Sequence, residues 1–178
     1  NNMNTSRYQI IVSKIHRWDY LGTKNYDNGT RLVGHVPHVG PEAYLHCLYP
    51  GLHSDDIDRL ETTMGVRIPQ QYRSFLHYAN GIRLFLKLSL YGLRRSYDRA
   101  SELAPEPFNI VTYNTHERPK GLCSDACVVG SYSYDGSNVF LINCDARVFR
   151  CKRKDGSAIL NEWSSLDHFL CGEFDRLE

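Results

Sequence analysis

The chain has 178 residues, of which 42 % are hydrophobic and 23 % are charged, and its formal net charge is +1. This length fits one domain, and the composition is typical of a folded globular chain rather than a disordered or membrane-embedded one. The near-zero charge excludes a chain-wide electrostatic field that would gather nucleic acid or an anionic membrane. We therefore expect neither of these as a direct partner.

Six cysteines are spread over the chain, and an even number can indicate disulfides in a small secreted protein. The first residues, NNMNTSRYQI, lack the basic start and the apolar core of an export signal. We therefore expect reduced thiols in a cytoplasmic protein. A mature secreted form with its signal already removed stays open as the alternative.

Residues 1–50 predict a helix followed by a loop-rich extension. Apolar residues recur at helical spacing within residues 6–18, at Ile10, Ile11, Ile15 and Trp18. Glycines, prolines and the turn sequence DNGT dominate residues 19–50, where we expect irregular structure and one short helix near residues 42–48. We interpret this N-terminal extension as part of the same domain as residues 51–178.

Residues 54–81 carry the clearest helical signals. Ser54 is a candidate N-cap for a first helix that ends at Gly65, a residue suited to the left-handed backbone of a helix stop. Pro69 opens a second helix, which ends at Asn80. The first helix carries an apolar stripe at Ile57, Leu60 and Met64. The two helices predict a corner whose apolar faces pack on a sheet.

Later segments predict β-strands and a closing helix. RLFLKLSLYGL alternates apolar and polar residues with a period of two, which is typical of a strand. FNIVTYN predicts a shorter strand, and ACVVGSY, SNVFLINC and RVFRCKR predict three more joined by short turns. LNEWSSLDHFLCGEF predicts the last helix. We therefore expect an α+β fold, a single domain with a mostly antiparallel sheet of five to six strands and helices packed on it.

Candidate catalytic and metal-binding residues do not combine into a recognisable pattern. A proline lies between His35 and His38, and the pair Cys123 and Cys127 is not followed by a second pair at matching spacing. The sequence has no GxSxG, P-loop, GxGxxG or HExxH motif. We therefore predict that the protein is not an enzyme and has no metal and no cofactor.

Three clusters remain as candidate contact sites. LRRSYDR and RVFRCKRK combine arginines with aromatic residues, which suits nucleic-acid binding and equally suits the solvated face of an edge hairpin. In GSYSYDGSN, Tyr132 and Tyr134 share strand parity and lie next to Asp135. Tyrosines at the edge of a loop are suited to anchor a protein partner, although they are also common in sheets.

The order of these motifs resembles the SUKH superfamily (Smi/Knr-like domains), which includes fungal cell-wall-synthesis regulators and bacterial immunity proteins. The resemblance spans residues 51–174 and leaves the first fifty residues without a match. It rests on GLHSDDIDRLETTMGVRIPQQYRSFLHYANG, LSLYGLRR, VVGSYSYDGSNVFLIN and RVFRCKR with EWSSLDHFL. It implies an α+β fold without enzymatic activity.

The resemblance also implies a function, the binding and neutralising of a cognate toxin domain from a polymorphic or contact-dependent toxin system. Inhibitors of nucleases are often acidic, whereas this chain is near neutral with basic patches, so the class of toxin stays open and a nuclease is one candidate. The alternative is a regulatory interaction module of a cell-wall or signalling pathway. A third reading is an uncharacterised hydrolase or nucleic-acid-binding protein. We expect a monomer or a weak dimer.

We predict that the concave face of the sheet and its loops carry the contact. Tyrosines supply rigid contact area and arginines supply directional hydrogen bonds. The predicted contact residues are Tyr91, Arg94, Arg95, Tyr132, Tyr134, Asp135 and Arg147.

Overall fold

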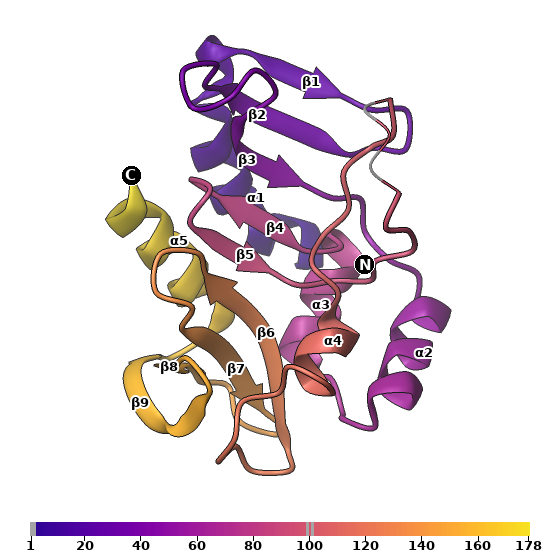
Figure 1. Cartoon of the computed structure of the whole chain (residues 1–178), viewed down its shortest axis with the longest axis vertical. Coiled ribbons are helices and arrows are strands. Elements are labelled where there is room, and N and C mark those ends of the chain that lie inside the picture. Colours follow the sequence, from indigo (N-terminus) through magenta and orange to yellow (C-terminus); the bar gives the residue numbers. More distant parts are fainter. Residues whose placement is uncertain (1–2, 99, 101) are drawn as a thin grey trace.

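The chain forms one antiparallel sheet, with α1, α3 and α5 packed behind it in the view of Figure 1. The computed structural model describes residues 3–98, 100 and 102–178, with side chains from residue 8 onward. In these described parts of the chain, none of the helices combines the length and the apolar character needed to cross a membrane. The α+β class predicted from the sequence is confirmed.

Within the described residues, the sheet has nine strands, and each strand pairs antiparallel with its neighbours in chain order. The expectation of five to six strands is therefore wrong. The strands are β1 (Thr23–Asn25), β2 (Arg31–His35), β3 (Tyr44–Leu48), β4 (Ile82–Leu84), β5 (Leu88–Leu90), β6 (Ala126–Tyr132), β7 (Asn138–Ile142), β8 (Val148–Lys152) and β9 (Asp155–Trp163). The helices are α1 (Met3–His16), the 3-10 turn η1 (Asp19–Leu21), α2 (Ser54–Met64), α3 (Gln70–Tyr78), α4 (Ile110–Asn114) and α5 (Leu166–Leu177).

The N-terminal extension is more regular than its composition suggests. The predicted first helix is present as α1, but the segment expected to be irregular holds η1 and the strands β1, β2 and β3. The short helix predicted near residues 42–48 is wrong, because these residues form β3. This strand pairs with β2 on one side and with β4 on the other, so the sheet satisfies its backbone groups on both edges.

The helices α2 and α3 form the corner that the sequence predicts. Gly65 ends α2 with a left-handed backbone (φ 68°), and its N–H donates to the carbonyl of Glu61 at 2.9 Å. The Glu61 carboxylate accepts the N–H of Ile68 at 2.8 Å and pairs with Arg73 of α3 at 3.0 Å. One acidic side chain thus ties the end of α2, the corner and α3 together.

Buried polar side chains attach this corner to the sheet. The Tyr72 hydroxyl of α3 donates to the carbonyl of Tyr91 at the end of β5. The Asn80 side chain accepts the N–H of Leu93 at 2.6 Å and donates to its carbonyl at 2.8 Å, as a neighbouring strand would. A Cβ at Gly92 would lie 2.1 Å from the Asn80 side-chain oxygen, which explains the glycine at this position.

The segment 83–93, predicted as a single strand, is a hairpin. Phe85, Leu86 and Lys87 form a three-residue turn between β4 and β5, in which Phe85 and Leu86 have positive φ, 54° and 58°. Residues other than glycine adopt this region at a cost of about 1–3 kcal/mol each. His46 of β3 supports the turn, because its Nδ1 accepts the N–H of Phe85 at 3.2 Å and its ring lies 4.5 Å from the Phe85 ring.

Two later elements also differ from the prediction. FNIVTYN is not a strand but contains the helix α4, which Asn109 caps by accepting the N–H of Val111 at 3.1 Å. Asn114 at the other end of α4 donates to the carbonyl of Val128 in β6 and accepts its N–H, both at 2.8 Å. The long strand β9 was not expected, and the final helix begins after it at Leu166.

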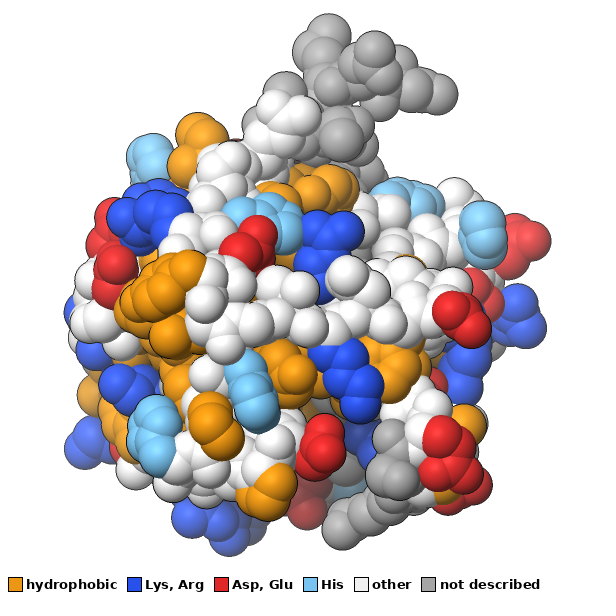
Figure 2. All heavy atoms as spheres, turned by 90° about the horizontal axis from the view of Figure 1, so that it is seen from above, with side chains coloured by type: hydrophobic (Ala, Val, Ile, Leu, Met, Phe, Trp, Pro, Cys, Tyr) orange, Lys and Arg blue, Asp and Glu red, His pale blue; other side chains and the backbone are white. Residues whose placement is uncertain are grey.

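The surface at the β1 end of the sheet carries mixed charges. Figure 2 shows this end from above, and acidic, basic and histidine side chains alternate with small apolar areas over the part that the structure describes. The mixture agrees with the net charge of +1. A face of this kind does not by itself select nucleic acid or an anionic membrane.

Candidate functional site

The turn between β6 and β7, residues 133–137, is the most highly organised surface segment that the sequence analysis singled out, and we call it the Tyr134 turn. Gly136 has φ 71°, and its N–H donates to the carbonyl of Tyr132 at 2.9 Å. Ser133 donates its N–H to the carbonyl of Lys87 at 2.7 Å, so the Tyr134 turn lies against the strained β4–β5 turn. Two turns from separate hairpins thus support each other.

Asp135 is fixed inside this turn. Its carboxylate accepts the N–H of Ser137 at 2.9 Å and the Ser137 hydroxyl at 2.6 Å, and it pairs with Arg150 of β8 at 2.8 Å. Partial burial alone would raise the pKa of Asp135, but these hydrogen bonds and the Arg150 guanidinium hold it below the usual value. The carboxylate therefore stays charged, and its contacts with Ser137 and Arg150 stabilise the turn.

Two arginines orient the Tyr134 side chain. Arg150 and Arg176 each donate to its hydroxyl oxygen, at 3.0 Å and 2.9 Å. Arg150 is 8 % exposed, whereas Tyr134 is 51 % exposed, so the hydroxyl is held from the protein side while much of the ring faces solvent. A fixed aromatic ring loses little conformational entropy when a partner covers it.

A buried network supports these arginines from below. The Tyr132 hydroxyl donates to the Glu173 carboxylate at 2.6 Å, and the two residues are 1 % and 3 % exposed. Arg176 donates to both oxygens of that carboxylate, at 2.9 Å and 2.7 Å. Burial raises the pKa of the Tyr132 hydroxyl, and the hydrogen bond to Glu173 raises it further. The guanidinium of Arg150 lies 3.9 Å from the centre of the Tyr132 ring.

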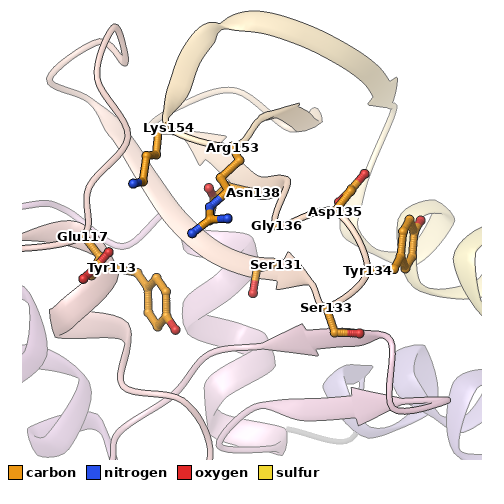
Figure 3. Close-up of a pocket in the computed structure, with 10 residues that line it drawn as sticks. All are labelled: Tyr113, Glu117, Ser131, Ser133, Tyr134, Asp135, Gly136, Asn138, Arg153 and Lys154. Carbon is orange, nitrogen blue, oxygen red and sulfur yellow. The ribbon is translucent and has the colours of Figure 1, made fainter.

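An open pocket of about 500 Å³ lies beside the Tyr134 turn, and we call it the turn pocket. Three segments form it: α4 and the residues after it, the β6–β7 hairpin, and the turn between β8 and β9 (Figure 3). Most of its lining side chains are polar. The lining residues are Tyr113, Glu117, Ser131, Ser133, Tyr134, Asp135, Gly136, Asn138, Arg153 and Lys154.

The predicted contact residues fall in different places. Tyr134 and Asp135 line the turn pocket, as the sequence grouped them. The exposure expected for Tyr91 and Tyr132 is wrong, because their side chains are 0 % and 1 % exposed. Strand parity placed them on a face without showing that helices and loops cover that face. Their contribution to a contact is therefore indirect, through the residues that they support.

Arg94 and Arg95 belong to a second, separate pocket of about 400 Å³ between α2, α4 and the segment after β5. Arg95 pairs with Asp56 of α2 at 3.1 Å. The Arg94 guanidinium lies 4.7 Å from the centre of the Tyr97 ring. The charge of Arg95 is thus partly balanced within the protein, and these arginines are not brought together with the Tyr134 turn.

Arg147 lies in neither pocket. It pairs with Asp145 at 2.8 Å within the β7–β8 turn and with Glu162 of β9 at 3.2 Å. These partners raise the pKa of its guanidinium, with the Asp145 hydrogen bond as the largest cause. The two carboxylates balance its charge and join the β7–β8 turn to β9.

Sequence reasoning missed the cationic side of the turn pocket. Arg153 and Lys154 were within the basic segment RVFRCKRK, but no strand had been predicted after it, so the segment was not seen to end in a hairpin turn. Tyr113 was missed because FNIVTYN was taken for a strand, and Glu117 was missed because no element was predicted for the residues that follow it. A prediction of β9 after RVFRCKRK would have placed Arg153 and Lys154 in the turn between the two strands.

Comparison with known proteins agrees with the observed fold. The sheet, the corner of α2 and α3 and the closing helix define an α+β protein whose most organised surface is a turn beside an open polar pocket. A sequence profile described as the SMI1 / KNR4 family (SUKH-1) matches residues 51–172, and the chain belongs to this family. The superfamily predicted from the sequence is confirmed. A search of curated proteins found no match.

Proposed function

We propose that this protein is a non-catalytic immunity protein that binds and neutralises a cognate toxin domain of a polymorphic or contact-dependent toxin system. Membership of the SMI1 / KNR4 family supports a binding role, since the family's immunity and regulatory members are generally non-catalytic. The Tyr134 turn and the turn pocket form the proposed contact surface.

The observation that carries this proposal is the fixation of an exposed tyrosine by two arginines. Tyr134 is half exposed, its hydroxyl is held by Arg150 and Arg176, and the network below it is buried. Rigid aromatic groups at an interface are frequent energetic anchors because they bury a large area at a small cost in entropy. A binding surface gains affinity from such an arrangement.

Charge supports a partner other than a cationic nuclease surface. The chain carries a net charge of +1, and the turn pocket presents Arg153 and Lys154. Mimicry of nucleic acid would require the opposite sign. The proposed target surface is therefore neutral or acidic where it covers the turn pocket.

Co-expression tests the proposed function. The candidate toxin is any toxic domain that a neighbouring gene encodes, and the wild-type protein is expected to rescue growth from it and to co-purify with it. Tyr134→Ala is expected to weaken the complex, whereas Tyr20→Ala, which removes another exposed tyrosine on η1, serves as the matched control.

The outcome also separates the alternative function. A protein that rescues no host cell from any neighbouring toxin, yet co-purifies with a protein of a cell-wall or signalling pathway, is a regulatory interaction module. An equal effect of Tyr134→Ala and Tyr20→Ala would place the contact away from the Tyr134 turn.

A further inference from the structure

We infer that the turn pocket receives an acidic side chain of the protein partner, and that Arg153 and Lys154 bind its carboxylate. This inference deepens the proposed function and rests on it for the existence of a protein partner. It assigns a ligand chemistry, a carboxylate on a protein surface, to a defined set of residues.

The first observation is that the two cations have no carboxylate partner within residues 3–98, 100 and 102–178. Arg147 and Arg150, the other two arginines between β7 and the end of β8, each pair with an acidic side chain. In Figure 3 the Arg153 guanidinium points toward the floor of the pocket, and the Lys154 side chain lies above it on the same side. Two adjacent unpaired cations repel each other, and a bound carboxylate removes that repulsion.

The second observation is that the fold holds these cations in place. Arg153 and Lys154 are the two turn residues between β8 and β9, and Lys154 has a left-handed backbone with φ 63°. A Cβ at Gly136 would lie 2.7 Å from the Cδ of Arg153, so the glycine lets the stem of this arginine lie across the Tyr134 turn. On the other side, Gly156 donates its N–H to the carbonyl of Lys120 at 2.7 Å. The hairpin tip is anchored on both sides.

The third observation concerns a buried hydroxyl beside Ser131 and Asn138, two of the residues that line the pocket. Tyr91 is 0 % exposed, and its hydroxyl has no hydrogen-bond partner of good geometry among the described residues. Burial raises the pKa of this hydroxyl, and Ser131 and Asn138, which line the pocket, lie near enough to lower it partly. A buried hydroxyl without a partner is costly, and a polar group that enters between Ser131 and Asn138 can relieve this cost.

The shape of the pocket favours a side chain of a macromolecule over a free small molecule. Small-molecule sites are mostly apolar and enclose most of their ligand, whereas the turn pocket is polar and open. A protein that covers the rim would exclude water and strengthen the ion pair. Glu117 lies across the pocket from Arg153 and Lys154 in Figure 3 and repels an entering carboxylate, so we expect the carboxylate to lie on the side of Arg153 and Lys154.

The inference can be tested without the partner, with the peptide tetraglutamate and its neutral analogue tetraglutamine as probes. Amide NMR signals of the wild-type protein around Ser131, Asn138 and Arg153 are expected to shift with tetraglutamate at low salt and not with tetraglutamine. Two charge-assisted hydrogen bonds place the expected dissociation constant in roughly the millimolar range. The shifts are expected to weaken as salt is added.

A matched pair of variants locates the effect. The double variant Arg153→Gln/Lys154→Gln is expected to lose at least tenfold in tetraglutamate affinity. Lys14→Gln/Arg17→Gln removes the same net charge from α1 and the residue after it, and is expected to change the affinity less than twofold. Equal losses in both variants, equal shifts with tetraglutamine, or no shift at the pocket would each overturn the inference.

The partner arm distinguishes failure of the inference from failure of the proposed function. If the toxin binds the wild-type protein and Arg153→Gln/Lys154→Gln with equal affinity, the pocket assignment is wrong and the immunity function stands. If no toxin binds the wild-type protein while tetraglutamate binds the pocket, the proposed function is wrong and the carboxylate chemistry of the pocket stands.

Discussion

Two buried tyrosines offer a direct test of the network beneath the Tyr134 turn. Tyr132 and Tyr91 are 1 % and 0 % exposed, so Tyr→Phe removes one hydroxyl from an equally buried position in each case. The Tyr132 hydroxyl donates to the Glu173 carboxylate at 2.6 Å, whereas the Tyr91 hydroxyl has no hydrogen-bond partner of good geometry among the described residues. The substitutions are chemically identical and differ in the hydrogen bond that they remove.

The expected difference follows from these contacts. A hydrogen bond to a charged group contributes about 1.5–3 kcal/mol, so Tyr132→Phe is expected to lower the free energy of unfolding by about that amount. Arg176 still binds Glu173, which keeps the cost away from the larger values seen for an uncompensated buried charge. Tyr91→Phe removes a hydroxyl without a partner and is expected to leave stability unchanged or to raise it by up to about 1 kcal/mol.

Urea unfolding followed by fluorescence measures both free energies. The dependence on urea concentration should be the same in all three proteins, so that the shift of the midpoint reports stability alone. Equal destabilisation by the two substitutions would refute the reasoning, because it would mean that the cost arises from repacking and not from the bond to Glu173.

Further predictions concern pH, packing and the partner. Burial lowers the pKa of His46 to about 4 from the ordinary 6.5, so between these values the unfolded chain alone takes up the proton and stability falls as the pH falls. The loss due to His46 is about 2 kcal/mol between pH 7 and pH 5, and urea unfolding at both pH values should show it in the wild type and not in His46→Asn. A pH dependence shared by both proteins would exclude His46 as its origin. Gly92→Ala forces a Cβ against Asn80 and is expected to cost about 2–4 kcal/mol in thermal unfolding, whereas Gly172→Ala, with open space around it on α5, is expected to gain up to about 1 kcal/mol. A Gly92→Ala variant as stable as the wild type would contradict the close contact with Asn80. For the contact surface, Arg150→Gln is expected to lower partner affinity while Arg147→Gln leaves it within twofold, as surface plasmon resonance would show; the reverse order would shift the site toward β9.

The helical corner could be predicted from the sequence because its signals are local. Gly65 and Pro69 each act through their own backbone conformation, and the stripe of Ile57, Leu60 and Met64 is buried as its spacing indicates. The β4–β5 turn could not be predicted in the same way. Because three residues separate the paired residues Leu84 and Leu88, the two have the same parity, and the alternation continues through the turn as if the strand were unbroken. Phe85 and Leu86 also lack the glycine or asparagine that usually marks such a turn.

The strands β1 and β9 could not be predicted for a related reason. β1 is short, and much of β9 is exposed, so neither shows a buried alternation, and their strand conformation depends on pairing with β2 and β8. For α4, the β-branched residues favoured a strand in the sequence-based prediction. The N-cap at Asn109 and the hydrogen bonds of Asn114 to β6 stabilise a helix instead.

The candidate site was predicted only where its residues are consecutive. Tyr134 and Asp135 lie in one turn and were grouped correctly, although their role as partner contacts stays a prediction. Arg150 and Arg176, which hold Tyr134, come from β8 and α5. The sequence does not indicate that these two elements lie next to the Tyr134 turn. Arg94 and Arg147 were predicted as contacts because they lie in the basic segments LRRSYDR and RVFRCKRK. The fold places both outside the turn pocket.

The affinity of the protein for a candidate toxin domain, if one is encoded beside its gene, tests the central proposal most directly. Isothermal titration calorimetry with wild type, Tyr134→Ala and Tyr20→Ala is expected to show a tight one-to-one complex that Tyr134→Ala weakens by at least tenfold and Tyr20→Ala leaves within twofold. No heat of binding with the wild-type protein, or equal affinities for all three, would contradict a partner-binding role for the Tyr134 turn.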